Sequence, residues 1–248
     1  MRVPRIRAAV LLLSGLAASC GGSLGRQYEY EEQVYLSVDG AATIVVDASL
    51  PALVALRGLP LDLTPGVRPD RDAVRAMLEA RGCAVSSVGQ PWTRRGRRFI
   101  QVRVATEDIR TVSRCGLLDW STYGFEPAGE DELQYDQRVG AAAGGDPGAV
   151  NWDGSELVGF KLHLPSKILE HNVKRLEDGE NGSVERGNIL TYEQRFADRR
   201  AGVPVEMKVR MGADSILART LIIFGIAFAA AVLVLGGIIW VTIRRARR

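Results

Sequence analysis

The chain has 248 residues, 32 basic and 29 acidic side chains, a formal net charge of +3, three cysteines and two histidines. Eight of the 32 basic residues are arginines at the two ends, so the middle of the chain is acidic, with a net charge of −5. The basic character of the whole chain therefore reflects targeting and topology signals, which excludes a nucleic-acid footprint.

Residues 1–19 have the layout of a secretory signal peptide. Three arginines precede a short apolar stretch at 8–13, and small residues follow it. The apolar stretch is too short to span a membrane, so the segment predicts export and cleavage.

The end of this signal, Leu-Ala-Ala-Ser-Cys-Gly-Gly at 16–22, resembles a bacterial lipobox. It predicts cleavage before Cys20 and attachment of lipid to that cysteine, which would make residues 20–27 a lipidated tether. A plain signal peptide that happens to contain a cysteine is the alternative. The string Gly-Gly-Ser-Leu-Gly at 21–25 matches a hydrolase motif, but that motif needs a strand-to-helix elbow, and here it belongs to the tether.

Residues 28–140 are expected to form the first part of an α+β ectodomain. Alternating and helical patterns predict strands at 28–38 and 42–48, helices at 50–56 and 70–82, strands at 84–88 and 98–105, a helix at 106–116, and strands at 120–125 and 132–138. From residue 42 the order is β-α-β-β-α-β, which is typical of a ferredoxin-like antiparallel sheet with two helices on one face.

Cys83 and Cys115 each follow a predicted helix. An oxidising exterior and an even cysteine count outside the lipobox favour a disulfide between them. A disulfide needs Cα atoms within about 7 Å, whereas the antiparallel helices of a ferredoxin-like fold end at opposite edges. The two inferences conflict, so the pairing stays open.

A basic hairpin joins two of the predicted strands and carries Trp92, Arg94, Arg95, Arg97 and Arg98. In the functional interpretation the arginines contact anionic lipid headgroups, at about 1 kcal/mol for each basic residue, and Trp92 sits in the membrane interface. The alternative is a solvated hairpin turn.

A glycine-rich linker at 141–151 is followed by a β-rich membrane-proximal part at 152–215, so the ectodomain is one domain or two. This part contains the only histidines, His163 and His171. A zinc site needs three or four ligands, so we expect these histidines to be structural and expect no metal or cofactor. The acidic run at 130–132 is typical of a solvated loop.

Residues 216–243 are predicted to contain a transmembrane helix. The 24 uncharged residues from Thr220 to Ile243 span about 36 Å, enough for a hydrocarbon core of about 30 Å. Four arginines in the tail at 244–248 place the C-terminus in the cytoplasm. Gly225 and Ala229 form a small-residue face that can pack against a partner helix or a second copy of the chain, or can simply face lipid.

Two segments have a distinctive pattern: the proline-led segment 164–172, which ends in Asn172, and the strand at 186–192, which begins near Gly187 and contains an aromatic residue. Together with the lipobox and the single C-terminal span, these segments resemble the mycobacterial LppM-like lipoprotein family. The resemblance implies a non-enzymatic envelope protein that binds lipids or glycolipids. Ser166 and Tyr192 stand where the family pattern has glycine and tryptophan.

These observations predict a non-catalytic lipoprotein at the cytoplasmic membrane, with its ectodomain outside. It would bind an envelope lipid, a glycolipid or a membrane-protein partner. The alternatives are a hydrolase that acts on envelope material and an assembly subunit that associates through its transmembrane helix.

Overall fold

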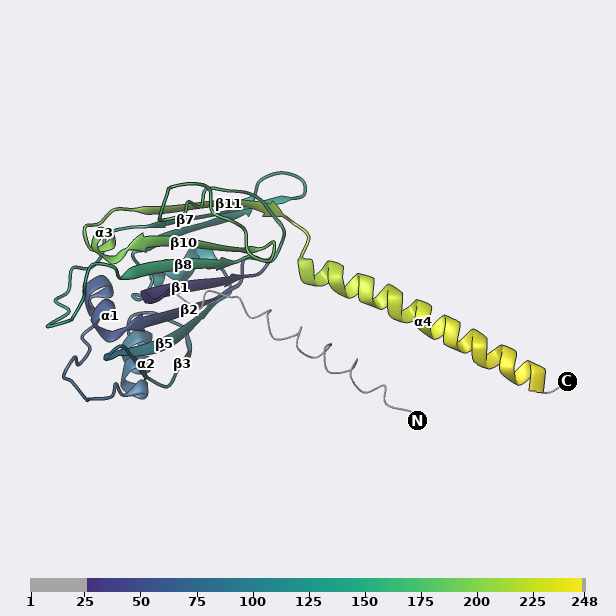
Figure 1. Ribbon diagram of the computed structural model, residues 1–248, viewed down its shortest axis with the longest axis horizontal. Coiled ribbons are helices and arrows are strands. Elements are labelled where there is room, and N and C mark those ends of the chain that lie inside the picture. The colour runs from purple at the N-terminus through teal and green to yellow at the C-terminus, as the bar shows by residue number, and fades with distance from the viewer. Residues whose placement is uncertain (1–25, 247–248) are drawn as a thin grey trace, which may run out of the picture.

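Two β-sheets pack face to face and a long helix leaves them at one end, as Figure 1 shows for the computed structural model, which describes residues 26–246. The first sheet has seven strands: β1 (Tyr28–Leu36), β2 (Ala42–Ser49), β3 (Val85–Val88), β4 (Trp92–Arg94), β5 (Arg97–Thr106), β8 (Leu157–His163) and β10 (Ile189–Arg195). The second has four: β6 (Ser121–Pro127), β7 (Glu132–Val139), β9 (Ile168–His171) and β11 (Val205–Gly212). The fold class is therefore α+β, as the sequence predicts.

The strands from the two parts of the folded domain, 28–140 and 152–215, share both sheets. The first sheet has the order β10-β8-β1-β2-β5-β3, and the second has the order β6-β7-β11-β9. β1 pairs with β8 in parallel, and β7 pairs with β11 in antiparallel fashion. The described residues on either side of segment 141–151 therefore contribute to one hydrophobic core. The segment itself lies against α1 (Leu50–Arg57), where Ala143 N–H donates to the Leu56 carbonyl at 2.9 Å.

Local sequence signals set the bounds of the two longer helices of the folded domain. Before α1, the Ser49 hydroxyl accepts a hydrogen bond from Ala52 N–H, and after it Gly58 adopts the left-handed conformation with φ of 60°. Before α2 (Arg71–Glu79), the Asp70 carboxylate accepts from two backbone N–H groups of the first turn. A shorter helix, α3 (Phe196–Arg200), follows β10.

The ferredoxin-like pattern is present in part. β5 lies between β2 and β3, which is the order expected for the β-α-β-β portion. The next strand differs, because β6 belongs to the second sheet and β1 occupies the edge of β2 where the ferredoxin-like fold places its fourth strand. The expected second helix is the 3₁₀-helix η1 (Ile109–Arg114). Six residues of 3₁₀-helix span about 12 Å, whereas the ten residues of β5 span about 33 Å, so η1 is too short to cover the sheet.

This arrangement brings the two cysteines of the folded domain together. Cys83 and Cys115 form a disulfide with their Cα atoms 4.3 Å apart. The predicted conflict disappears because η1 is not a long antiparallel neighbour of α2. Beside the disulfide, Gly82 has φ of 78°, and a Cβ there would lie 2.8 Å from the carbonyl oxygen of Arg114. Glycine is therefore the residue that fits this close approach.

The strand registers give the folded domain two ends. At the end that we call distal, Ser49 pairs with Phe99, and α1 and the β4–β5 hairpin lie there. At the proximal end, Ala42 pairs with Thr106 in the first sheet and Gly212 pairs with Glu132 in the second. Figure 1 shows the last helix, in yellow, leaving the proximal end and extending away from α1.

This last helix, α4 (Ile216–Ala246), has 31 residues and is about 46 Å long. By length and composition, Thr220–Ala246 is suited to crossing a membrane. Near its end, the Arg244 guanidinium lies 4.9 Å from the centroid of the Trp240 ring. The signal peptide, Cys20 and the last two arginines of the tail lie outside the described residues.

Candidate functional site

A surface pocket with a volume of about 980 Å³ lies at the distal end of the domain. The β4–β5 hairpin, the loop from Leu63 to Pro69 and the segment from Pro147 to Asn151 form its walls. Leu63, Trp92 and Val150 supply apolar surface. The volume is in the range of pockets that hold small organic ligands.

Five prolines shape this pocket and restrict its backbone: Pro51, Pro65, Pro69, Pro91 and Pro147. A proline ring fixes φ and reduces the number of conformations open to the unfolded chain. The prolines therefore limit the backbone conformations that are open to the pocket walls.

The pocket is strongly basic. Four arginines line it (Arg68, Arg95, Arg97 and Arg98), and no aspartate or glutamate is among its described lining residues. Arg97 forms an ion pair with the buried carboxylate of Glu29, with Nε and Oε1 2.8 Å apart. Arg98 donates to the backbone carbonyls of Val67 and Asp62. These two arginines therefore hold the pocket together.

Arg68 and Arg95 are different, because their side chains are exposed and neither makes an ion pair or hydrogen bond within the described part of the chain. Arg95 occupies the hairpin tip with φ of 48°, an uncommon backbone conformation for a residue with a long side chain. Both guanidinium groups are free to bind an anion in the pocket.

The rest of the predicted basic hairpin has a structural role. The Arg94 guanidinium lies over the Phe99 ring at 4.4 Å and donates to the Tyr28 carbonyl at 2.6 Å. Trp92 stacks on the same Phe99 ring, with centroids 5.6 Å apart, and forms part of the pocket wall. The sequence pointed to this hairpin but not to Arg68, which is isolated in the sequence and joins the site only through the fold.

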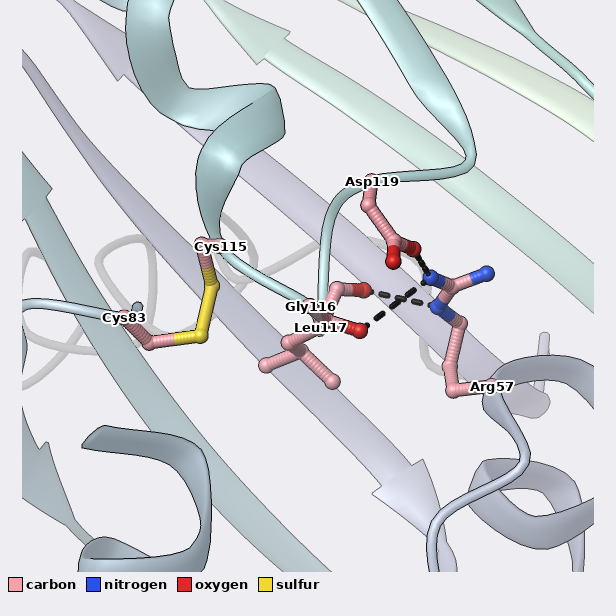
Figure 2. Close-up of a disulfide and its surroundings, with 6 residues drawn as sticks. All are labelled: Arg57, Cys83, Cys115, Gly116, Leu117 and Asp119. Atoms are coloured by element: carbon pink, nitrogen blue, oxygen red, sulfur yellow. Dashed lines mark hydrogen bonds and ion pairs between the residues drawn. A yellow bond between two sulfur atoms is a disulfide. The ribbon is translucent and has the colours of Figure 1, made fainter. Parts of the chain in front are cut away.

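A second polar cluster is buried beside the disulfide, and Figure 2 shows its residues. The Arg57 side chain is buried, although it carries a charge. Its Nε donates to the Leu117 carbonyl at 2.7 Å, its Nη2 donates to the Gly116 carbonyl at 3.3 Å, and Nη2 also pairs with Asp119. Cys115 directly precedes these acceptor residues, so the disulfide helps to hold them against Arg57.

Trp120 connects Arg57 to another buried arginine. The guanidinium carbons of Arg57 and Arg199 lie 4.6 Å and 5.4 Å from the centroid of the Trp120 ring. Arg199 is fully buried and donates to the Gly140 carbonyl at 2.6 Å, and burial lowers its pKa. Cation–π contact and backbone carbonyls therefore stabilise both charges inside the domain.

A buried carboxylate links the two sheets. Glu32 on β1 accepts hydrogen bonds from Tyr30 on the same strand and from Tyr123 and Gln137 of the second sheet, at 2.8 to 3.1 Å. Burial raises the pKa of Glu32, and these hydrogen bonds oppose that effect. The sequence alone indicates that Glu32 is buried, because it occupies an inward position of an alternating strand, between Tyr30 and Val34.

The two histidines lie in different sheets. The His163 ring stacks on Tyr35 in the first sheet, with centroids 4.1 Å apart, and His171 lies on β9 in the second. Burial lowers the pKa of both, which keeps them neutral near pH 7. In the residues that the structure describes, no group of three histidine, cysteine or acidic side chains is arranged to hold a metal ion. Of the acidic run at 130–132, Glu132 pairs with Arg210.

Gly225 and Ala229 lie on the exposed surface of α4, and an added Cβ at Gly225 would meet nothing within 4 Å. Packing of a partner helix against them stays a prediction.

Comparison with known proteins gives one likeness of fold. No family model matches the chain, and no curated protein matches it. The structure is similar to the NMR structure of the folded domain of LppM from Mycobacterium tuberculosis, with a TM-score of 0.39 and 10% sequence identity over 76% of this chain and 92% of that one. The likeness agrees with the weak resemblance to the LppM-like family that the sequence predicts. It carries no information about function.

Proposed function

We propose that the chain is a non-catalytic extracytoplasmic lipoprotein, held at the cytoplasmic membrane, whose distal pocket binds an anionic envelope lipid or glycolipid. The observation that carries this proposal is the pocket itself. It combines apolar walls with four arginines and no described carboxylate in its lining, and two of those arginines, Arg68 and Arg95, have no partner among the described residues.

The chemistry of the pocket suits an amphipathic anion. A guanidinium is a planar fork of donors that binds phosphate or carboxylate in a bidentate manner. Leu63, Trp92 and Val150 offer apolar surface to the part of the ligand that follows the charged group. A ligand with only one of these features would leave either the arginines or the apolar wall unsatisfied.

The same side chains support binding rather than proton transfer. Arginine stays protonated at any physiological pH, and indole and proline rings have no titratable group in this range. The hydrolase alternative requires a histidine or a carboxylate that converges on the substrate. His163 and His171 lie on strands of two different sheets and do not line this pocket.

The membrane placement rests on α4 and the ends of the chain. Thr220–Ala246 is suited to crossing the membrane, and the basic tail that follows supports a cytoplasmic C-terminus. Lipid on Cys20 would add a second anchor outside the cytoplasm. Contact of α4 with a membrane-protein partner or a second copy, through Gly225 and Ala229, is compatible with this arrangement.

Titration calorimetry of the full chain in a neutral detergent tests the proposal. Short-chain phosphatidylglycerol is the anionic probe, and short-chain phosphatidylcholine is the neutral comparison. Two arginines at about 1 kcal/mol each predict that R68A/R95A binds the anionic probe about 30-fold more weakly. The matched control is K167A/R186A, which removes two exposed basic residues from the proximal end and should bind normally.

Equal affinity for the two probes would contradict the proposal, as would full binding by R68A/R95A. Raised salt should weaken binding of the anionic probe because exposed charges are screened.

A further inference from the structure

The pocket and the start of α4 lie at opposite ends of the domain. Arg97 begins β5 at the pocket, and Thr106 ends this strand at the proximal end, so the strand separates the two by about 33 Å. Attraction between exposed charges is screened over about 8 to 10 Å at physiological ionic strength. With the domain extended from α4 as in Figure 1, the pocket arginines are too far away to be attracted to the bilayer that holds this helix.

The domain is also attached to α4 by a short, hydrogen-bonded link. β11 ends at Gly212 and α4 begins at Ile216. Gly212 N–H donates to the Lys167 carbonyl at 3.0 Å, Ala213 N–H donates to the Asp131 carbonyl at 2.8 Å, and Ile216 N–H donates to the Pro165 carbonyl at 3.0 Å. These bonds tie the link to two loops of the domain, which opposes tipping of the domain onto the membrane surface.

The proximal loops and the lining of the distal pocket carry charges of opposite sign. The proximal loops at 37–41, 107–110, 126–132, 164–167, 185–188 and 213–215 contain nine acidic residues and three basic ones. The distal pocket has four arginines and no acidic lining residue in the described chain. An anionic lipid surface therefore repels the proximal loops and attracts the lining of the distal pocket.

The N-terminal side of the domain begins at the distal end as well. β1 starts at Tyr28, close to the hairpin, because Arg94 bonds to its carbonyl. Cys20 lies outside the described residues, and only five residues lie between it and Arg26. The six Cα–Cα steps from Cys20 to Arg26 reach at most about 21 Å when extended, whereas β1 alone covers about 30 Å. A lipid on Cys20 is therefore tethered nearer to the distal end than to the start of α4.

We propose that the distal end engages a second, anionic lipid surface, so that the chain links it to the bilayer that holds α4. This proposal rests on the proposed function, because the same pocket supplies the contact, and it adds which surface presents the ligand. The partner is a lipid layer opposite the ectodomain. The pocket arginines and the apolar wall take an anionic headgroup and its adjoining chain from that layer.

The test uses the full chain with Cys20→Ser, reconstituted in neutral phosphatidylcholine vesicles and mixed with separate vesicles that contain phosphatidylglycerol. Light scattering measures clustering of the two vesicle populations. A donor dye on Ala201→Cys, an exposed residue that follows α3 at the distal end and does not line the pocket, measures energy transfer to acceptor lipids placed either in the chain's own vesicles or in the anionic ones. We expect clustering, with strong transfer to the anionic vesicles and weak transfer to the chain's own bilayer. R68A/R95A should abolish the clustering, and K167A/R186A should preserve it.

Three outcomes overturn the proposal. The first is strong energy transfer to the chain's own bilayer, which would mean that the pocket lies on that membrane. The second is clustering that persists in R68A/R95A. The third is an absence of clustering while calorimetry still shows binding of short-chain phosphatidylglycerol, in which case the proposed function stands and the link between two layers fails. If the short-chain lipid does not bind either, both proposals fail together.

Discussion

The interior around Trp120 and the distal pocket both depend on arginine, but they use it in different ways. Arg57 and Arg199 are buried, contact the same indole ring, and donate to backbone carbonyls. Arg68 and Arg95 are exposed on the pocket and have no partner within the described residues. The first pair stabilises the fold, and the second pair remains free to bind a ligand.

The number of arginines in a segment is therefore a poor guide to its capacity to bind an anionic ligand. The basic hairpin has four arginines, but the guanidinium groups of Arg94, Arg97 and Arg98 form hydrogen bonds or an ion pair within the protein. The useful quantity is the number of guanidinium groups left without an internal partner. Substitutions that separate stability from binding can test this distinction.

The largest expected effect on stability is from Arg57→Ala. It would leave the carbonyls of Leu117 and Gly116 without their donors, at about 1–3 kcal/mol each, so we expect a loss of about 4 kcal/mol in the free energy of unfolding. Urea unfolding measures this loss. Arg138→Ala is the control, because its ion pair with Glu206 is exposed and should be worth less than about 1 kcal/mol. Similar losses of stability in Arg57→Ala and Arg138→Ala would show that the buried arginine stabilises the fold no more than an exposed one.

Removal of the disulfide should have the next largest effect. The two cysteines are 32 residues apart, and opening a loop of this size costs about 3–4 kcal/mol in the chain-entropy description. Unfolding of C83A/C115A by urea measures this cost. Because Cys115 adjoins the acceptors of Arg57, the loss in the triple variant with Arg57→Ala should be smaller than the sum of the separate losses. Strict additivity would show that the disulfide does not position those acceptors.

The buried Glu32 should make stability depend on pH. Its pKa is raised in the folded state, so the fold retains a proton that the unfolded chain releases. Its contribution is therefore fully present below the unfolded-state pKa and is lost as the pH rises through the folded-state pKa, at about 1.4 kcal/mol for each pH unit between the two values.

Glu32→Gln removes this titration. Unfolding midpoints measured between acidic and neutral pH should show the wild-type protein losing stability relative to the variant as the pH rises. Parallel curves for the two proteins would mean that Glu32 does not titrate differently in the folded and unfolded states.

The smallest expected effect on stability comes from R68A/R95A. Both side chains are exposed and make no hydrogen bond or ion pair with a described partner, so the free energy of unfolding should change by less than about 0.5 kcal/mol. Thermal unfolding measures this, while calorimetry shows the loss of lipid binding. A large loss of stability would assign these arginines to the fold and remove the basis for the proposed site.

The local elements were largely predictable from the sequence. The strands at 28–38, 42–48, 98–105 and 132–138 have matching strands in the structure because alternation of apolar and polar residues reports which face is buried. The Asp70 cap before α2 is also a local signal, because its carboxylate accepts hydrogen bonds from N–H groups two and three residues further along the chain. Short elements without a clear period, β4, β9 and α3, were missed because their formation depends on neighbouring segments.

The site was predictable in part. The hairpin from Trp92 to Arg98 is visible in the sequence as a run of arginines, and it does line the pocket. Arg68 and the prolines come from separate loops that meet only after folding. The partners of Arg94 and Arg97, which remove them from binding, are backbone and carboxylate groups brought close by the strand pairing.

Composition and periodicity were sufficient to predict the α+β class, the apolar helix at 220–243 and the concentration of arginine at one hairpin, because both are local properties of the chain. Only the folded structure shows that β6 belongs to the second sheet, that Cys83 forms a disulfide with Cys115, and that the basic pocket lies at the end opposite α4. These outcomes depend on contacts between residues far apart in the chain, where strand register and burial outweigh local preference.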